Sequence, residues 1–148
     1  MKNIFFLLLL FAIPAFAQTL PKTFKSVEGK SISTTKKVVI VDLLLTTCPH
    51  CQEASKGLNR LLAKHTKRLQ VVGIALDGND GTKVKSFQFS HSPAYPIVVG
   101  TNDMLLNFSP QNRNVPAFVI FKNGKYAQTI IGWTAETEKQ LDSLINGN

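Results

Sequence analysis

The chain has 148 residues, and its 17 lysines and arginines against 9 aspartates and glutamates give a formal net charge of +8. A chain of this length suits one domain with one hydrophobic core. The basic residues are scattered, without a stripe interleaved with aromatic residues, so a solvated basic surface is favoured and a nucleic-acid partner is disfavoured.

The N-terminus has the pattern of a secretory signal peptide at residues 1–17. Lys2 gives a short basic start, an apolar run follows at 4–13, and Ala-Phe-Ala at 15–17 matches the small-x-small pattern of a cleavage site. The run is too short for a permanent transmembrane helix, and retention as an anchor is the less favoured alternative. Cleavage after Ala17 leaves residues 18–148 as a single domain. We expect that domain to be periplasmic or secreted, where disulfides persist.

The first half of the predicted domain alternates strands and helices. A small hairpin is expected at 24–33, with its turn at Glu28-Gly29. The nearly continuous apolar run at 38–45 (VVIVDLLL) predicts a strand covered on both faces, as in a parallel or mixed central sheet. A helix is expected to begin at the cysteines that follow, because leucines recur at helical spacing at 58, 61 and 62. A second buried strand is predicted at 71–76.

The second half is predicted to end in a hairpin and a helix. The elements expected before them are a turn at 77–81, a short helix at 83–89, an extended piece at 95–99 and a short helix at 103–108. Asn123-Gly124, between apolar runs at 117–121 and 125–131, is a strong hairpin signal. Thr134 is expected to cap a last helix whose apolar face holds Leu141, Leu144 and Ile145. This order predicts an α/β layered domain with a mixed sheet.

The only two cysteines, Cys48 and Cys51, lie between the predicted central strand and the first long helix. Haem attachment needs Cys-x-x-Cys-His, and Gln52 follows the pair. A closed zinc site needs four ligands, whereas His65 and His91 lie without ligand spacing and are interpreted as ordinary helix or loop histidines. A structural disulfide closing so short a ring removes little chain entropy. A redox dithiol is therefore favoured over structural or metal-binding use, with no metal and no cofactor expected.

The position of the pair supports this interpretation. A helix N-terminus favours a thiolate at Cys48, and one helical turn brings Cys51 within bonding distance. Asp42 lies inside the apolar run that precedes the pair, so burial is expected to raise its pKa and to suit it for general acid–base work. The alternative is an Asp42 side chain turned toward an exposed end of the strand.

Three segments of the chain resemble thioredoxin-fold proteins, and in particular the extracytoplasmic TlpA/ResA-like thiol-disulfide oxidoreductases. VDLLLTTCPHC at 41–51 resembles the strand leading into the family's Cys-x-x-Cys motif. NVPAFVIFKNGK at 114–125 resembles the cis-proline loop with its strand, turn and last strand, and YPIVV at 95–99 is similar to a segment that TlpA-like members insert. The spacing from the cysteines to the proline is too short for the helical domain of DsbA-type oxidants. The resemblance implies a thioredoxin-like three-layer fold, with a mixed central sheet flanked by helices.

The resemblance also implies a role for each matching residue. Cys48 matches the exposed nucleophile and Cys51 the buried resolving thiol. Asp42 matches the buried acid that moves the proton of the resolving cysteine. Pro116 matches the cis-proline that lies against the disulfide, and Val115 before it would offer backbone groups to a substrate strand.

The residues around the cysteines depart from the TlpA-like pattern in two ways. Thr47 stands where most members have an aromatic residue, which changes how the site would grip partners. The dipeptide Pro49-His50 is typical of DsbA-type oxidants, and we place Pro49 in the substrate-binding surface. The His50 imidazole is expected to stabilise the Cys48 thiolate and so to make the disulfide oxidising.

Together these features predict an extracytoplasmic thiol-disulfide oxidoreductase. It would act as a monomer on protein thiols or disulfides and would be recycled by a membrane redox partner. The dipeptide favours an oxidase or isomerase, whereas the TlpA-like body favours a reductase, as in cytochrome c maturation. A thiol peroxidase is disfavoured because Leu45 stands where that class has threonine. A copper carrier of the Sco type is the non-enzymatic alternative, and the shorter cysteine spacing disfavours it.

Overall fold

The structure is a computed structural model that describes residues 18–78, 80–108 and 114–147. The signal peptide predicted at 1–17 lies outside the described residues. Within the described ranges, no helix combines the length and the apolar character needed to cross a bilayer.

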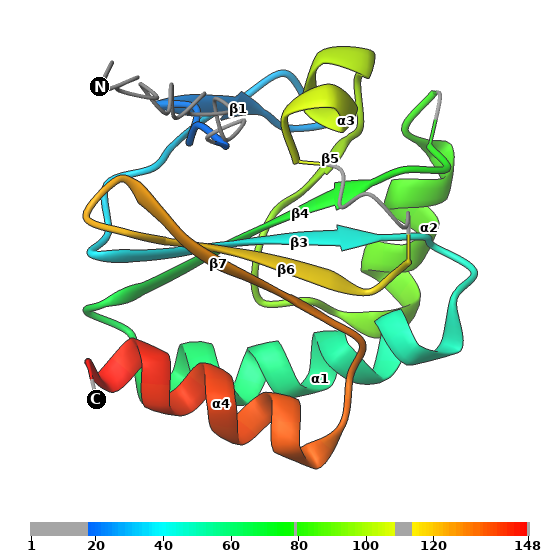
Figure 1. The fold of residues 1–148 in the computed structure, drawn as a ribbon. Coiled ribbons are helices and arrows are strands. Elements are labelled where there is room, and N and C mark those ends of the chain that lie inside the picture. Colours follow the sequence, from blue (N-terminus) through cyan, green and yellow to red (C-terminus); the bar gives the residue numbers. More distant parts are fainter. Residues whose placement is uncertain (1–17, 79, 109–113, 148) are drawn as a thin grey trace, which may run out of the picture.

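A mixed sheet of five strands forms the middle layer of the molecule (Figure 1). Its strands, in the order in which they pair, are β5 (Ile97–Val99), β4 (Leu69–Ala75), β3 (Val38–Leu44), β6 (Ala117–Lys122) and β7 (Lys125–Ile131). β3 pairs parallel with β4 and antiparallel with β6, β4 pairs parallel with β5, and β6 and β7 form the predicted hairpin. All seven residues of β3 are buried, which explains why its sequence is almost continuously apolar.

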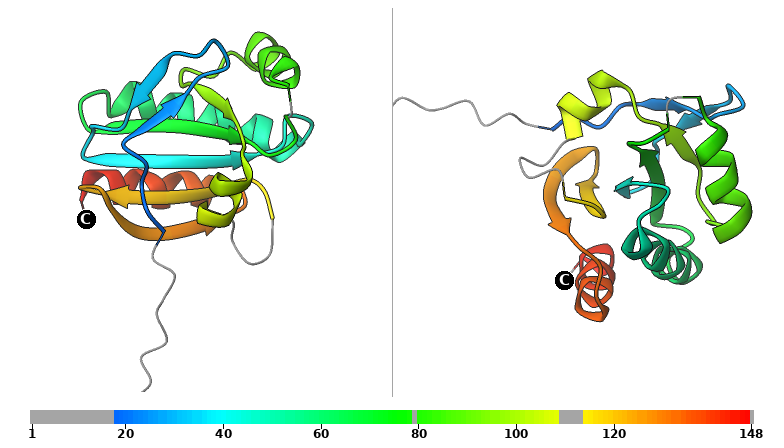
Figure 2. Two further views of the ribbon diagram at one scale, coloured as in Figure 1. Left: turned by 90° about the horizontal axis from the view of Figure 1, so that it is seen from above. Right: turned by 90° about the vertical axis from the view of Figure 1, so that its right-hand side faces the viewer.

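Helices cover one face of this sheet, and a small hairpin with one short helix covers the other (Figure 2). The helices are α1 (Pro49–Lys64), α2 (Thr82–His91), α3 (Asn102–Phe108) and α4 (Ala135–Asn146). The cluster of buried side chains on one face includes residues of α1, α2 and α4. The other face packs against α3 and the hairpin of β1 (Thr23–Lys25) and β2 (Ser31–Ser33). The predicted order of elements is confirmed.

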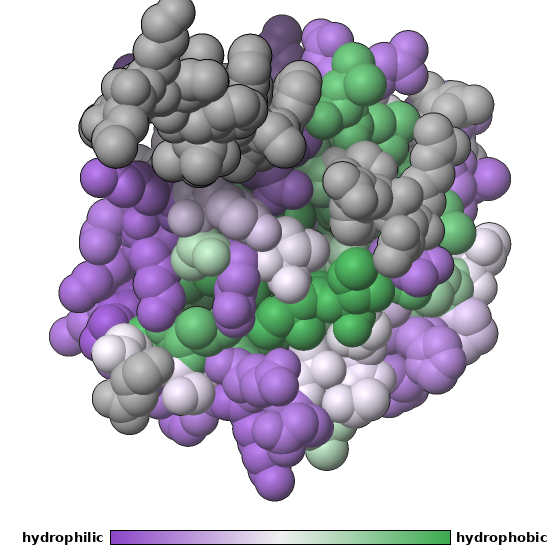
Figure 3. Space-filling model, in the orientation of Figure 1, coloured by the Kyte–Doolittle hydropathy of each residue, from purple (hydrophilic) through white to green (hydrophobic). Residues whose placement is uncertain are grey.

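The alternation of side chains along β3 assigns each residue to one of these two clusters. Val38, Ile40 and Leu44 pack on the side of α1, and their neighbours pack toward the hairpin and α3. Asp42 falls on the α1 side of this alternation. Figure 3 shows that on the face drawn, a band of hydrophobic side chains runs between the sheet and α4, with hydrophilic side chains around it.

One predicted element is shorter than expected. The piece at 95–99 forms a strand only from Ile97 onward, because β4 offers β5 only three partners, Gly73 to Ala75. Before the strand, the Gly73 N–H donates to the Pro96 carbonyl over 2.9 Å. Tyr95 therefore lies in a connecting segment and enters the core from there, at 5% exposure.

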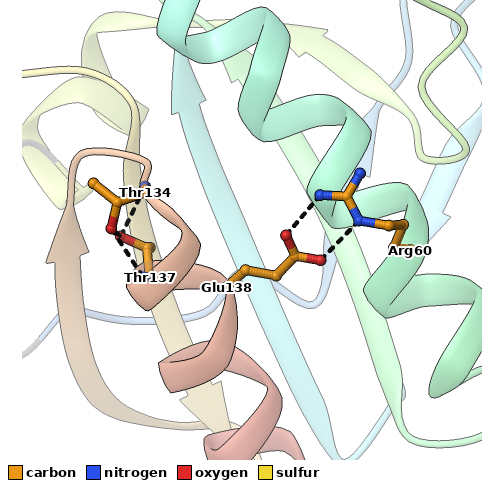
Figure 4. A network of polar contacts seen from close by, with 4 residues as sticks. All are labelled: Arg60, Thr134, Thr137 and Glu138. Carbon is orange, nitrogen blue, oxygen red and sulfur yellow. Dashed lines mark hydrogen bonds and ion pairs between the residues drawn. The ribbon is translucent and has the colours of Figure 1, made fainter.

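Two contacts bind α1 to the C-terminal part of the chain. The Trp133 ring lies directly over Gly57 of α1, where a Cβ atom would come within 1.8 Å of Trp133 Cζ2. The Arg60 guanidinium donates to both carboxylate oxygens of Glu138 on α4, over 2.9 and 2.6 Å (Figure 4). Because α1 starts at the cysteines, these contacts also fix the helix that presents them.

The start of α4 has the cap that its sequence predicts. The Thr134 hydroxyl accepts from the Thr137 N–H over 3.2 Å, and the Thr137 hydroxyl accepts from the Thr134 N–H over 3.2 Å. Figure 4 shows this reciprocal pair beside the Arg60–Glu138 contact. Two otherwise unpaired donors of the helix terminus are satisfied in this way.

Replacing Thr134 with alanine should lower the free energy of unfolding by about 1 kcal/mol, because the Thr137 N–H loses its acceptor. Chemical denaturation followed by circular dichroism measures the change. Thr66→Ala, at an exposed threonine in the turn after α1, is the matched control and should change stability by less than about 0.5 kcal/mol. Equal losses in the two variants would contradict the assigned cap.

Candidate active site

The two cysteines occupy the first turn of α1, directly after the carboxyl end of β3. Cys48 is the N-cap of the helix, and its Sγ accepts from the Cys51 N–H over 3.3 Å. Pro49 takes the first helical position, where its missing N–H costs nothing. Both cysteines are free thiols; Cys48 is partly exposed, whereas Cys51 is only 1% exposed. A partner sulfur can therefore approach Cys48, while Cys51 is covered.

The loop before Cys48 is held by a carboxylate that the sequence analysis did not single out. Asp77, which follows β4, accepts from the Thr46 N–H over 3.0 Å and from the Thr46 hydroxyl over 2.6 Å. A signal for this contact was present in the sequence, since the carboxyl ends of neighbouring parallel strands meet at one edge of a sheet. This pair fixes the path of the chain two residues before the exposed cysteine.

Asp42 is buried in β3, as its position in the apolar run predicts, and its charge acts on Cys51. It is 1% exposed; its Oδ2 accepts from the Tyr95 hydroxyl over 3.0 Å, and its Oδ1 has no hydrogen-bond partner. Burial raises the pKa of Asp42 from 3.8 to about 7, and the Tyr95 hydrogen bond acts in the opposite direction. The expected burial is confirmed, and the alternative of an exposed carboxylate is wrong.

The buried thiol is a poor nucleophile unless a base removes its proton. Burial raises the pKa of Cys51 far above its ordinary range, and a hydrogen bond to Cys48 and the nearby charge of Asp42 add to this increase. The carboxyl and the thiol are thus electrostatically coupled. Asp42, which titrates near neutral pH, is a base of suitable strength beside a thiol that needs one.

The remaining predicted site residues lie in the cis-proline segment and in the first turn of α1. The Val115–Pro116 peptide bond is cis, as the sequence predicts, and Val115 packs on the same apolar cluster as Cys48 and Cys51. Pro49 and His50 are exposed on the first turn of α1. Among the described residues no hydrogen bond joins the His50 ring to Cys48, so its expected influence on that sulfur would act through charge.

The other two histidines lie elsewhere. His65 caps the C-terminal end of α1, and its Nε2 contacts Asp142 Oδ1 of α4 over 2.6 Å. The His91 ring packs against Phe87 on α2, with 4.7 Å between ring centroids. Over residues 18–78, 80–108 and 114–147, no three His, Cys, Asp or Glu side chains gather in a group that could hold a metal ion.

No family model and no curated protein sequence matches the chain, but solved structures do. A thioredoxin-family thiol:disulfide interchange protein from Chlorobium tepidum TLS has a TM-score of 0.74 at 20% identity, with coverage of 88% of this chain and 93% of that chain. StoA from Bacillus subtilis has a TM-score of 0.66 at 20% identity, with coverage of 84% and 97%. A secreted Mycobacterium tuberculosis disulfide oxidoreductase homologous to Escherichia coli DsbE has a TM-score of 0.68 at 17% identity, with coverage of 85% and 95%.

The chain therefore has the thioredoxin-like fold, and the predicted fold class is confirmed. The shared architecture is a mixed five-stranded sheet flanked by helices. In this chain the cysteine pair stands where the central strand meets the first long helix.

Replacing Asp42 with asparagine should stabilise the reduced protein at neutral and alkaline pH. The pKa of Asp42 is about 7 in the folded protein and 3.8 ordinarily, so the protonated carboxyl favours the folded state. The contribution of Asp42 to the free energy of unfolding is therefore fully present below about pH 4 and is lost as the pH rises through about 7. Asparagine stays neutral, so the variant should lack this loss. The gain above pH 7 should be on the order of 4 kcal/mol, from about three pH units at about 1.4 kcal/mol each.

Denaturant unfolding of both proteins from pH 4 to pH 9 measures this difference. Asp103→Asn, at an exposed carboxyl in the first turn of α3, is the control and should follow the wild-type curve. If the free energy of unfolding had the same pH dependence in the wild type and in Asp42→Asn, the pKa of Asp42 would not be raised by folding.

Proposed function

We propose that the protein is a thiol-disulfide oxidoreductase that exchanges disulfides with protein thiols through the Cys48–Cys51 pair. The observation that carries this proposal is the unequal burial of two cysteines on one helical turn. Cys48 is accessible at the helix N-terminus, and Cys51 is covered and lies beside a buried carboxyl group. These are the positions that an attacking thiol and a resolving thiol require.

Each site residue has a part in the proposed exchange. The Cys48 thiolate attacks a partner disulfide and forms a mixed disulfide, and Asp42 takes the proton of Cys51. The Cys51 thiolate then attacks Cys48 Sγ, which closes the Cys48–Cys51 bond and releases the partner as a thiolate. The reverse steps oxidise a partner dithiol. Val115 and Pro116, with Pro49, form the surface that receives the partner chain.

The proposed location is outside the cytoplasm, with residues 1–17 removed as a signal peptide. A structural neighbour from Mycobacterium tuberculosis is described as secreted, and the chain's own start has the basic, apolar and small-residue pattern of a signal. In such a compartment a monomeric enzyme would need a membrane redox partner to restore its working state. No cofactor is required, because the two sulfurs carry the electrons.

The proposed direction is oxidation or isomerisation of partner thiols, from the Pro49-His50 dipeptide. A charged imidazole close to Cys48 would stabilise the thiolate, favour the reduced state and make the disulfide a better oxidant. The competing candidate is a reductase, which the resemblance of the body to TlpA-like proteins favours.

Replacing Cys51 with serine should trap a mixed disulfide between Cys48 and a partner cysteine, because the resolving thiol is gone. Incubation with a peptide that contains one intramolecular disulfide, followed by non-reducing mass spectrometry, detects the adduct. Cys48→Ser should form no adduct, since its remaining thiol is covered. An adduct on Cys51 in that variant, or none on Cys48 in the first, would overturn the assigned roles.

Replacing His50 with proline should lower the reduction potential of the pair, because the reduced form loses the imidazole that is proposed to stabilise the Cys48 thiolate. The wild-type value is expected closer to the about −120 mV of DsbA than to the about −270 mV of thioredoxin, and the variant should move toward the latter. Equilibration with glutathione redox buffers measures both. His91→Gln, on α2, is the control and should leave the potential unchanged. A wild-type value near −270 mV that His50→Pro leaves unchanged would favour the reductase.

A further inference from the structure

The segment before β5 carries Tyr95 into the core on a backbone fixed from two sides. Asn59 of α1 accepts from the Ala94 N–H over 2.7 Å and donates to the Ser92 carbonyl over 3.1 Å. On the other side, the Gly73 N–H of β4 donates to the Pro96 carbonyl over 2.9 Å. The position of the tyrosine is thus set by α1 and β4 together, the two elements on either side of Asp42.

A missing side chain on β4 makes room for the ring. Gly73 is the register partner of Asp42 across β3 and β4. A Cβ atom at Gly73 would lie 3.3 Å from Tyr95 Cε2 and 2.9 Å from Ile97 Cγ1, closer than ordinary packing allows. The glycine therefore lets the Tyr95 ring lie next to Asp42, where its hydroxyl donates to Oδ2 over 3.0 Å.

The Tyr95 hydroxyl keeps its proton throughout the working range of pH. Burial and the nearby charge of Asp42 raise the pKa of Tyr95 well above its ordinary value. The Ser55 hydroxyl acts on this phenol in the opposite direction, although its geometry falls outside that of a hydrogen bond. The phenol is thus a permanent donor to Asp42.

Few groups besides Tyr95 act on the Asp42 carboxyl. The charge interaction with Cys51 comes from α1, and the register partners on the neighbouring strands are Gly73 on β4 and Phe118 on β6. The last two have no titratable side chain. Oδ2 is occupied by the phenol and Oδ1 is buried without a partner, so Oδ1 is the oxygen left to receive a proton.

We propose that Tyr95 is a positioning residue for the thiol exchange, because its hydroxyl holds Asp42 Oδ2 and directs the proton of Cys51 to Oδ1. This inference rests on the proposed function. In the mixed disulfide, the Cys51 S–H gives its proton to Oδ1, and the thiolate attacks Cys48 Sγ. The Cys48–Cys51 bond forms, the bond from Cys48 to the partner sulfur breaks, and the partner leaves with the electron pair as a thiolate. In the reverse reaction the proton returns from Oδ1 to Cys51.

Removal of the hydroxyl should lower the fraction of Asp42 that is ionised at neutral pH. The hydrogen bond stabilises the charged carboxylate, so Tyr95→Phe should raise the pKa of Asp42 above its value of about 7. The loss of one hydrogen bond to a charged group corresponds to an upward move of about one pH unit. At pH 7 the resolution step should then slow by roughly fivefold, because fewer carboxyl groups are ionised.

The experiment uses reduced full-length protein and dithiobis(nitrobenzoate), a chromogenic disulfide. The first release of chromophore reports attack by Cys48, and the second reports resolution by Cys51. In Tyr95→Phe the first phase should keep its wild-type rate, and the pH midpoint of the second phase should move upward by about one unit. Tyr126→Phe, which removes a hydroxyl from a half-exposed tyrosine on β7, is the matched control and should move neither phase.

The double variant Asp42→Asn/Tyr95→Phe distinguishes an effect of Tyr95 on Asp42 from an effect on the packing of the core. In the Asp42→Asn background the second phase should be slow, and adding Tyr95→Phe should change its pH profile no further. The role of Tyr95 would be overturned if Tyr95→Phe left the pH midpoint of the second phase unchanged. It would also be overturned if Tyr95→Phe caused the same shift in the Asp42→Asn background. Either result would leave the proposed function standing. A wild-type protein without a second phase would instead overturn the proposed function.

A measurement on the wild-type protein covers the case in which Tyr95→Phe does not fold. The NMR resonances of the Tyr95 ring should shift with the titration of Asp42 near pH 7, because the two groups share one hydrogen bond. The Tyr126 resonances should stay unchanged over the same range. A Tyr95 signal that is flat through the Asp42 titration would overturn the proposal.

Discussion

A carboxyl group buried in the central strand is the constraint on which the active-site end of this protein depends. β3 is covered on both faces, and the alternation of its side chains turns Asp42 toward α1 and the cysteines. The lost hydration costs the charged carboxyl on the order of 4 kcal/mol. An apolar side chain of similar size would avoid this cost. A carboxyl at this depth fits the proton acceptor that the proposed exchange requires.

Helix geometry alone gives the two thiols unequal exposure to solvent. Cys48 ends the connection from β3 and caps α1, so its sulfur faces solvent and a backbone N–H. Cys51 lies one turn later and faces the sheet, so the same helix that exposes one sulfur covers the other. Contacts of α1 with Trp133 and Glu138 hold that orientation. The point at which the helix starts therefore determines the unequal exposure on which the proposed roles of Cys48 and Cys51 rest.

The sequence predicts what depends on local signals and misses what depends on distant contacts. The apolar run of β3, the Asn123-Gly124 turn and the Thr134 cap each lie within a few residues, and all three predictions are confirmed. The contacts missed join residues far apart in the chain: Thr46 to Asp77 over 31 positions and Asp42 to Tyr95 over 53. Burial of Asp42 could be predicted, but the partner of its carboxylate could not, because it enters from a segment whose position β4 and α1 determine.

The coupling of Asp42 to Cys51 links the redox state of the pair to the proton on the carboxyl. An ionised Asp42 opposes a thiolate at Cys51, and a Cys51 thiolate opposes ionisation of Asp42 by the same free energy. Formation of the disulfide removes the charge that Cys51 can carry, so the carboxyl is freed from this repulsion in the oxidised protein. Such linkage is reciprocal. If ionisation of Asp42 favours the oxidised pair, the oxidised pair must favour ionisation of Asp42 by the same free energy. In the proposed exchange, the proton that leaves Cys51 and the electrons that leave the pair are therefore coupled through one buried carboxyl group, whose pKa the Tyr95 hydrogen bond lowers.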